Sequence, residues 1–288
     1  MVKKWIKRAA MLLGLFVFLN VFVSFIYPGV AELKRQNPGM TSFMKYRQDE
    51  WRKQGKGVRI RQCWVPLSRI SHYAIKAVII AEDDKFWSHD GFDFEAMQKA
   101  LEKDLKKRKL KAGGSTISQQ LAKNIYLSPS RNPIRKLREA IFTWRIERNL
   151  SKKRIIELYL NVAEWGEGIF GIEAAARRYF GKAAASLTAQ EAAKLAAVLP
   201  NPRRFNPTGS SRFVTRRTER IYQIMVRRGI VIPEYEELMA EPAEPIVMTT
   251  PEMDAPQPAA DHEENGSAPV PDEPDTGEKP DDEANVDK

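Results

Sequence analysis

The sequence has almost none of the residues that cross-link a chain or chelate a metal. Its 288 residues include a single cysteine, Cys63, which excludes an intramolecular disulfide. The three histidines, His72, His89 and His262, are scattered and lack the spacing of a zinc site. We therefore expect neither a disulfide nor a structural zinc ion.

Residues 241–288 lack aromatic side chains altogether. They hold 9 of the 18 prolines, and 15 Asp or Glu against two Lys give them a net charge of −13. Such a segment cannot bury enough apolar area to offset the entropy lost when it becomes ordered. We expect a disordered, acidic, Pro-rich tail.

Charge is missing from residues 9–27, a run of 19 in which only Asn20 and Ser24 are polar. It is long enough to cross about 30 Å of hydrocarbon at about 1.5 Å per residue. Basic residues within 1–8 predict a cytoplasmic N-terminus, a single-pass anchor in the cytoplasmic (inner) membrane, and a bulk exposed on the periplasmic side. A cleaved signal peptide is the alternative, because small residues follow, but the run exceeds the usual apolar length of about 7–15.

What the chain has in abundance is positive charge. The whole chain carries +10, so residues 1–240 carry +23 once the acidic tail is set aside. Such a surface attracts anionic partners, either nucleic acid or lipid headgroups. The predicted anchor favours lipid, and we expect no nucleic-acid partner.

The middle of the chain has helical periodicity and no run of strands, which predicts a mainly α fold. Residues 28–63 read as a juxtamembrane connector and residues 64–240 as the folded domain. A predicted helix extends from Ser68 through Ala81 and places Glu82 at its end. The negative end of a helix raises the pKa of a carboxylate, which suits a general base. The alternative is a solvated surface acid.

A second candidate region is glycine-rich and begins another helix. Gly113 and Gly114 precede Ser115 and Thr116, and Thr116 with Gln119 has the spacing of a capping box. Helix N-termini bind phosphate, and Lys123 is expected two turns further on nearly the same face. An ordinary capped helix without a ligand is the alternative.

Taken together, these segments resemble the peptidoglycan glycosyltransferase family, which includes monofunctional biosynthetic transglycosylases and one domain of bifunctional penicillin-binding proteins. The first family motif is present at Glu82, Asp83, Phe86, His89 and Gly91. The second is complete over 113–124, the third falls at Arg135, Lys136 and Glu139, and the fourth resembles 157–161 with the glycines that follow. The resemblance covers about residues 64–207.

The resemblance implies a lysozyme-like helical domain with a cleft and a small membrane-proximal subdomain. It implies that lipid II is polymerised into β-1,4-linked glycan by inverting transfer from a lipid-linked glycan, with release of undecaprenyl pyrophosphate. No transpeptidase activity is expected. The expected partners are lipid II, the lipid-linked growing glycan, the membrane, and other cell-wall synthesis or division proteins.

Site roles follow from the same resemblance. Glu82 would be the general base, and Lys123 and Arg131 would neutralise the departing pyrophosphate. Glu139 would be the second essential carboxylate, either through a divalent cation (Mg²⁺ or Mn²⁺) or by pairing with a nearby cation. The other residues expected to contact substrate or brace the cleft are Asp83, Ser115, Gln119, Gln120, Asn124, Arg135 and Lys136.

Two other functions fit parts of the sequence. A lytic enzyme on a lysozyme-like fold would use Glu82 as an acid to cut existing glycan. A non-catalytic scaffold would use the basic surface to bind anionic lipids.

Overall fold

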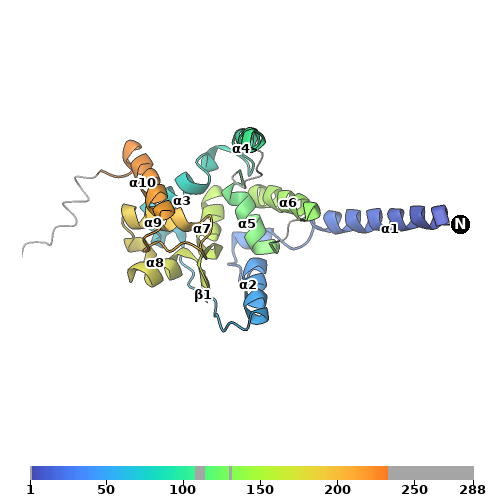
Figure 1. The fold of residues 1–288 in the computed structure, drawn as a ribbon, viewed down its shortest axis with the longest axis horizontal. Coiled ribbons are helices and arrows are strands. Elements are labelled where there is room, and N and C mark those ends of the chain that lie inside the picture. The colour runs from blue at the N-terminus through green and yellow to red at the C-terminus, as the bar shows by residue number, and fades with distance from the viewer. Residues whose placement is uncertain (1, 108–113, 130–131, 233–288) are drawn as a thin grey trace, which may run out of the picture. The chain divides into compact units, whose positions relative to one another are not determined.

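The computed structural model describes residues 2–107, 114–129 and 132–232, and nearly all of its regular structure is helical (Figure 1). In chain order the helices are α1 (Val2–Val23), α2 (Ser42–Lys53), α3 (His72–Glu82), α4 (Phe94–Lys107), α5 (Ile117–Tyr126), α6 (Pro133–Asn149), α7 (Lys152–Val162), α8 (Ile172–Phe180), α9 (Ala189–Val198) and α10 (Arg212–Arg227). Single 3-10 turns lie at Ala31–Lys34, Leu67–Arg69, Phe86–Ser88 and Ala184–Ser186. The mainly α prediction is confirmed. The expected acidic tail lies outside the described residues.

Two groups of packed helices form the core. Helix α9 lies between α3 and α10, where its small residues Ala192, Ala193 and Ala196 are buried and let the neighbouring helices approach closely. Helix α5 packs against α2, α6 and α7 through Ile117 and Leu121, both fully buried. Two of the helices that carry predicted site residues, α3 and α5, are therefore held against the core.

Local sequence signals fix where several helices begin. The capping box predicted at Thr116 is present, with Gln119 as its reciprocal partner, and a second one lies at Thr188 with Glu191. Asn132 caps α6, and Pro133 occupies its first turn, where the missing N–H costs nothing.

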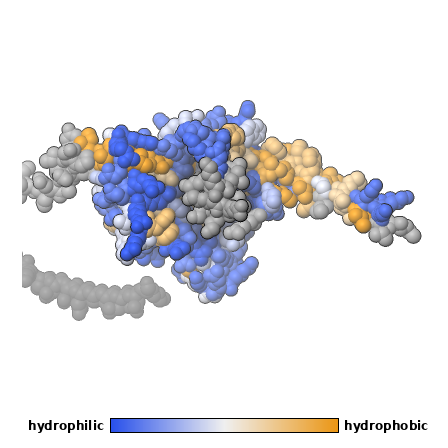
Figure 2. Space-filling view, turned by 45° about the horizontal axis from the view of Figure 1, so that its top comes forward, coloured by the Kyte–Doolittle hydropathy of each residue, from blue (hydrophilic) through white to orange (hydrophobic). Residues whose placement is uncertain are grey.

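The N-terminal helix is long and apolar enough to span a membrane over Lys3–Val23, alone in this among the helices of the described ranges. Its large apolar side chains are exposed, and Figure 2 shows them as an orange projection with hydrophilic residues near its outer end. The helix differs from the predicted span 9–27: it begins at Val2 and ends at Val23. Pro28 disfavours helical conformation just before it, and nothing interrupts the helix upstream.

The C-terminal end of α1 is tied to α6. Arg138 Nε donates to Ser24 Oγ at 2.9 Å, and Arg145 donates to the carbonyl oxygens of Ser24 and Ile26 at 2.9 Å each. Phe25 meets the Trp144 ring edge-on at 6.3 Å. The anchor is therefore joined to the folded domain by side chains as well as by the chain.

Residues 28–63 are not merely the connector that we expected. Helix α2 packs against α5, and its Met44 and Trp51 are each 1% exposed, so it belongs to the core. Its basic residues gave no sign of this, because Arg47 can be partly buried only by bonding to Glu164, at 2.9 Å, which lies far away in the sequence.

A small sheet was missed altogether. Strand β3 (Ile169–Phe170) pairs in parallel with β1 (Arg61–Gln62) and antiparallel with β2 (Glu164–Gly166). Strands of two or three residues are too short for their alternation to be visible in a sequence. Gly168, at φ 75°, makes the turn between β2 and β3 close to Arg59.

Candidate active site

Glu82 is the last residue of α3, and its side chain is only 12% exposed. Both carboxylate oxygens accept a hydrogen bond. Gln120 Nε2 donates to Oε2 at 2.9 Å, and Arg217 donates to Oε1 at 3.0 Å. The carboxylate is thus held by α5 on one side and by α10 on the other.

Burial raises the pKa of Glu82, and this outweighs the opposing effects of Gln120, Arg217 and Lys123. A carboxylate with a raised pKa is a stronger proton acceptor than a solvated Glu. From the sequence we expected the end of the helix to raise the pKa of Glu82, whereas in the structure the largest cause is desolvation.

Tyr159 of α7 sets the orientation of Gln120. Its hydroxyl donates to Gln120 Oε1 at 3.0 Å, which turns the amide N–H₂ toward Glu82. Tyr159 is 1% exposed, and burial holds its pKa well above the usual value, so it stays a neutral donor. Gln120 therefore presents a fixed donor to Glu82.

Asp83 braces the segment after Glu82. Its Oδ2 accepts from the backbone N–H of Ile117 at 2.9 Å, and its Oδ1 lies 2.8 Å from His89 Nε2. Because Gly91 N–H donates to His89 Nδ1 at 3.1 Å, Nε2 is the ring nitrogen that carries the hydrogen. Thr116 Oγ1 donates to the Gly91 carbonyl at 2.7 Å. These bonds fix the first motif to the N-terminus of α5.

A second carboxylate, Glu139 of α6, lies in a cationic setting. It is 3% exposed, with one oxygen 2.8 Å from Arg135 NH1 and the other bonded to Lys136 Nζ. Lys123 of α5 interacts electrostatically with both acids. Burial lowers the pKa of Lys123, while Glu139 and Glu82 both raise it. Three cations are thereby gathered around one buried acid.

These residues do not fit a metal site built by protein ligands. Both oxygens of Glu139 are taken by cations, and the described ranges contain no group of three or more His, Cys, Asp or Glu side chains placed to hold an ion. We assign no step to a bound cation.

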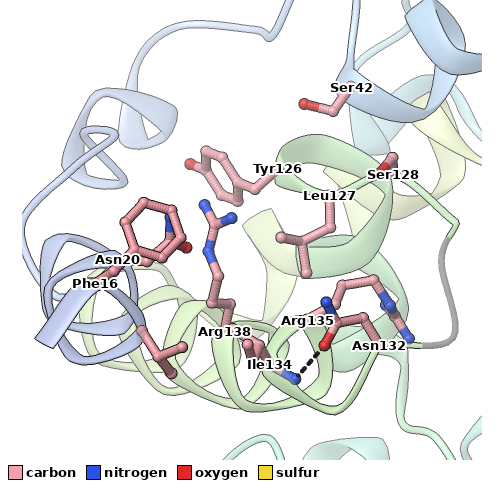
Figure 3. A pocket seen from close by; sticks show the side chains of 11 residues that line it. Phe16, Asn20, Ser42, Tyr126, Leu127, Ser128, Asn132, Ile134, Arg135 and Arg138 are labelled. Atoms are coloured by element: carbon pink, nitrogen blue, oxygen red, sulfur yellow. Dashed lines mark hydrogen bonds between the residues drawn. The ribbon is translucent and has the colours of Figure 1, made fainter. Parts of the chain in front are cut away.

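Two cavities open near the acids: Glu82 lines one, and Arg135, which bonds to Glu139, lines the other. One of about 280 Å³ is lined by Glu82, Asp83, Lys85, Ser115 and Thr116, together with residues of α4. A larger one, of about 470 Å³, lies between α1, the end of α5 and the start of α6 (Figure 3). Its lining is mixed: Phe16 and Val17 come from the apolar helix, Arg135 and Arg138 come from α6, and Asn132 caps α6.

Of the predicted site residues, Glu82, Asp83 and Ser115 line the smaller cavity and Arg135 lines the larger one. The others in the described ranges line neither: Gln119, Gln120, Lys123, Asn124, Lys136 and Glu139. Gln119, 3% exposed, closes the capping box of α5, and Asn124, 7% exposed, is buried. Both side chains are turned away from solvent, and that of Gln119 stabilises the start of α5. Arg131 lies outside the described residues.

Sequence reasoning missed Arg217 and did not single out Tyr159. Tyr159 lies within the fourth motif, which was the available signal. Arg217 had none, because α10 contains several arginines and only their orientation distinguishes them.

With this geometry in hand, comparison with known proteins identifies the family. The transglycosylase family model matches residues 50–226. The chain belongs to the transglycosylase family. The match begins within α2, as expected if that helix is part of the transglycosylase domain.

Several curated relatives are named biosynthetic peptidoglycan transglycosylase. That of Azoarcus sp. (strain BH72) is 50% identical over 202 residues, 70% of this chain and 87% of the relative. That of Aromatoleum aromaticum is 55% identical over 194 residues, 67% of this chain and 83% of the relative. That of Nitrosospira multiformis is 42% identical over 228 residues, 79% of this chain and 98% of the relative.

Proposed function

We propose that this transglycosylase polymerises lipid II into β-1,4-linked peptidoglycan strands at the outer face of the bacterial cytoplasmic membrane. The observation that carries the proposal is that two buried glutamates have different surroundings. Glu82 is a buried carboxylate of raised pKa beside one cavity, and Glu139 gathers cations beside another.

Inverting glycosyl transfer needs a proton acceptor on one face of the anomeric carbon and positive charge on the other. The sugar 4-hydroxyl of lipid II attacks the anomeric carbon of the lipid-linked glycan and gives its proton to Glu82. As the new C–O bond forms, the bond to the pyrophosphate breaks on the opposite face, which inverts the anomeric carbon. Lys123, Arg135 and Arg131 would stabilise the charge on the departing undecaprenyl pyrophosphate, because cations act most strongly where negative charge develops.

The larger cavity supports a lipid-linked leaving group. One wall belongs to a helix apolar enough to span a membrane, and the opposite wall carries Arg135 and Arg138. An amphiphile with a phosphate head and an apolar tail matches that mixed lining. The basic N-terminal residues support a cytoplasmic position for that end of α1, by the positive-inside rule.

The test is lipid II polymerisation by the full-length protein in detergent, with product resolved by length. The parent should consume lipid II and build long strands, and Glu82→Gln should be nearly inactive. Asp90→Asn, an exposed acid nearby, is the matched control and should behave like the parent. Shortening of preformed glycan without consumption of lipid II would instead identify a lytic enzyme, and lipid II binding without turnover would identify a scaffold.

A further inference from the structure

Helix α10 contacts the segment that carries Glu82 at two points. Arg217 donates to the Ala81 carbonyl and to Glu82 Oε1, both at 3.0 Å. Arg228, at the end of the helix, makes a forked pair with Asp84 at 2.6 and 2.8 Å. The two arginines are 11 residues apart, about three turns, so they project from nearly the same side of α10.

The packing of α10 explains why Arg217 faces inward. Val214, Thr218, Ile221 and Met225 form its buried stripe. Arg217 lies at the edge of that stripe and has a side chain 28% exposed, whereas Arg216 and Arg220 face solvent. The helix thus carries similar arginines in two environments, and only Arg217 reaches Glu82.

Arg217 is poorly arranged for stability alone. Its Nε is buried and has no hydrogen-bond partner among the residues that the structure describes. Leaving a buried donor unpaired costs on the order of 1–3 kcal/mol, and a partly buried ion pair returns little net stability. Unpaired buried groups recur where function requires a particular geometry.

We infer that Arg217 is a positioning residue of the transfer reaction, which holds the Glu82 carboxylate in place and keeps it ionised in a buried setting. The inference rests on the proposed role of Glu82 as base. With Oε1 held by Arg217 and Oε2 by Gln120, the carboxylate plane is fixed, and each oxygen keeps capacity to accept the proton of the incoming hydroxyl.

Two opposing effects act on this carboxylate. Burial favours the protonated acid, while Arg217 from α10 and Lys123 from α5 favour the ionised form. Tyr159 of α7 is neutral and contributes only through Gln120. Without Arg217 the pKa of Glu82 should rise further, so the base would be protonated over more of the pH range.

Arg217→Gln in the full-length protein tests this inference by lipid II polymerisation across the pH range in which carboxylates titrate. The acidic limb of kcat/KM should move to higher pH, and plateau kcat should fall roughly ten- to hundredfold, because small misplacement of a reacting group costs on that order. KM for lipid II should change little. Arg217→Lys, which keeps the charge, should retain the acidic limb of the parent. Arg216→Gln removes the same charge from the exposed face and should leave both quantities unchanged.

Two outcomes would overturn the inference. One is an Arg217→Gln profile that superimposes on that of Arg216→Gln. The other is a loss of thermal stability and activity with no movement of the acidic limb in either Arg217 variant. Both are separable from failure of the proposed function, which would appear as a parent protein that does not polymerise lipid II or as an active Glu82→Gln.

Discussion

Glu82 and Glu139 are the same residue type, both are largely buried, and their surroundings differ. Glu82 is held by one neutral amide and one cation, and burial raises its pKa. Glu139 is enclosed by Arg135 and Lys136, each of which donates to one of its carboxylate oxygens. The first environment suits an acid that must accept a proton. The second suits an acid that holds cations in place.

Burial alone therefore does not distinguish the acid that we propose as the base from the other one. What separates the two acids is whether neighbouring cations neutralise the carboxylate fully or only partly. Lys123, on α5, interacts electrostatically with both carboxylates. Substitutions on either side should therefore fail in different ways.

The largest expected effect is loss of the proposed base, Glu82. Glu82→Gln should lower kcat by roughly 10²- to 10⁴-fold at every pH, because the amide cannot take the proton. Its melting temperature should stay close to that of the parent or exceed it. Burial raises the pKa of Glu82, so the ionised parent loses stability as pH rises through that pKa, and any advantage of the variant should grow toward neutral pH. A melting temperature that falls sharply would contradict this view of Glu82.

Glu139→Gln should instead lose stability, and it should lose activity as a consequence. Removing its charge leaves Arg135 and Lys136 facing each other around a buried amide, at a cost of roughly 3 kcal/mol. The melting temperature should drop, and lipid II polymerisation should fall with it. If the variant is as stable as the parent and merely inactive, Glu139 has a more direct role in the reaction than cation placement.

Lys123 allows a sharper test of the leaving-group side. Burial lowers its pKa, so activity should decline at alkaline pH as the amine loses its proton. Lys123→Arg should move that alkaline limb to higher pH, because the guanidinium stays charged. Lys123→Met should lower kcat by roughly tenfold or more at all pH values. An alkaline limb that is identical in the parent and Lys123→Arg would show that another group sets it.

The smallest effect is expected at the outer contact of α10. Asp84 and Arg228 are about half exposed, so Asp84→Asn should cost no more than about 1 kcal/mol. Arg228 lowers the pKa of Asp84, so the contribution is present above the unfolded pKa and is lost as pH falls through the folded one. Thermal melts of Asp84→Asn and Arg228→Gln at neutral and acidic pH measure it. A large loss in either variant would make this contact part of the core.

Much of this could be read from the sequence, and the exceptions have physical causes. The end of α3 at Glu82 and both capping boxes follow from local periodicity and hydrogen-bonding chemistry, which act over a few residues. Arg217 could not be found, because contact between residues 135 positions apart depends on tertiary packing. The role of Gln119 was ambiguous for a related reason: one amide serves a cap or a ligand equally well until burial is known.

The bonds from α6 to the end of α1 have a consequence for how deep the site lies. Arg138 and Arg145 are seven residues apart, about 10 Å along α6, and both grip the segment just after the apolar helix. If α1 is embedded in the membrane, the helix that carries Glu139 is held at a fixed depth relative to the bilayer, because Arg135 and Arg138 line one cavity with Phe16 and Val17 of α1. The cations beside Glu139 would then meet the phosphates of a lipid that is still embedded, and sugar transfer would not require that lipid to leave the membrane.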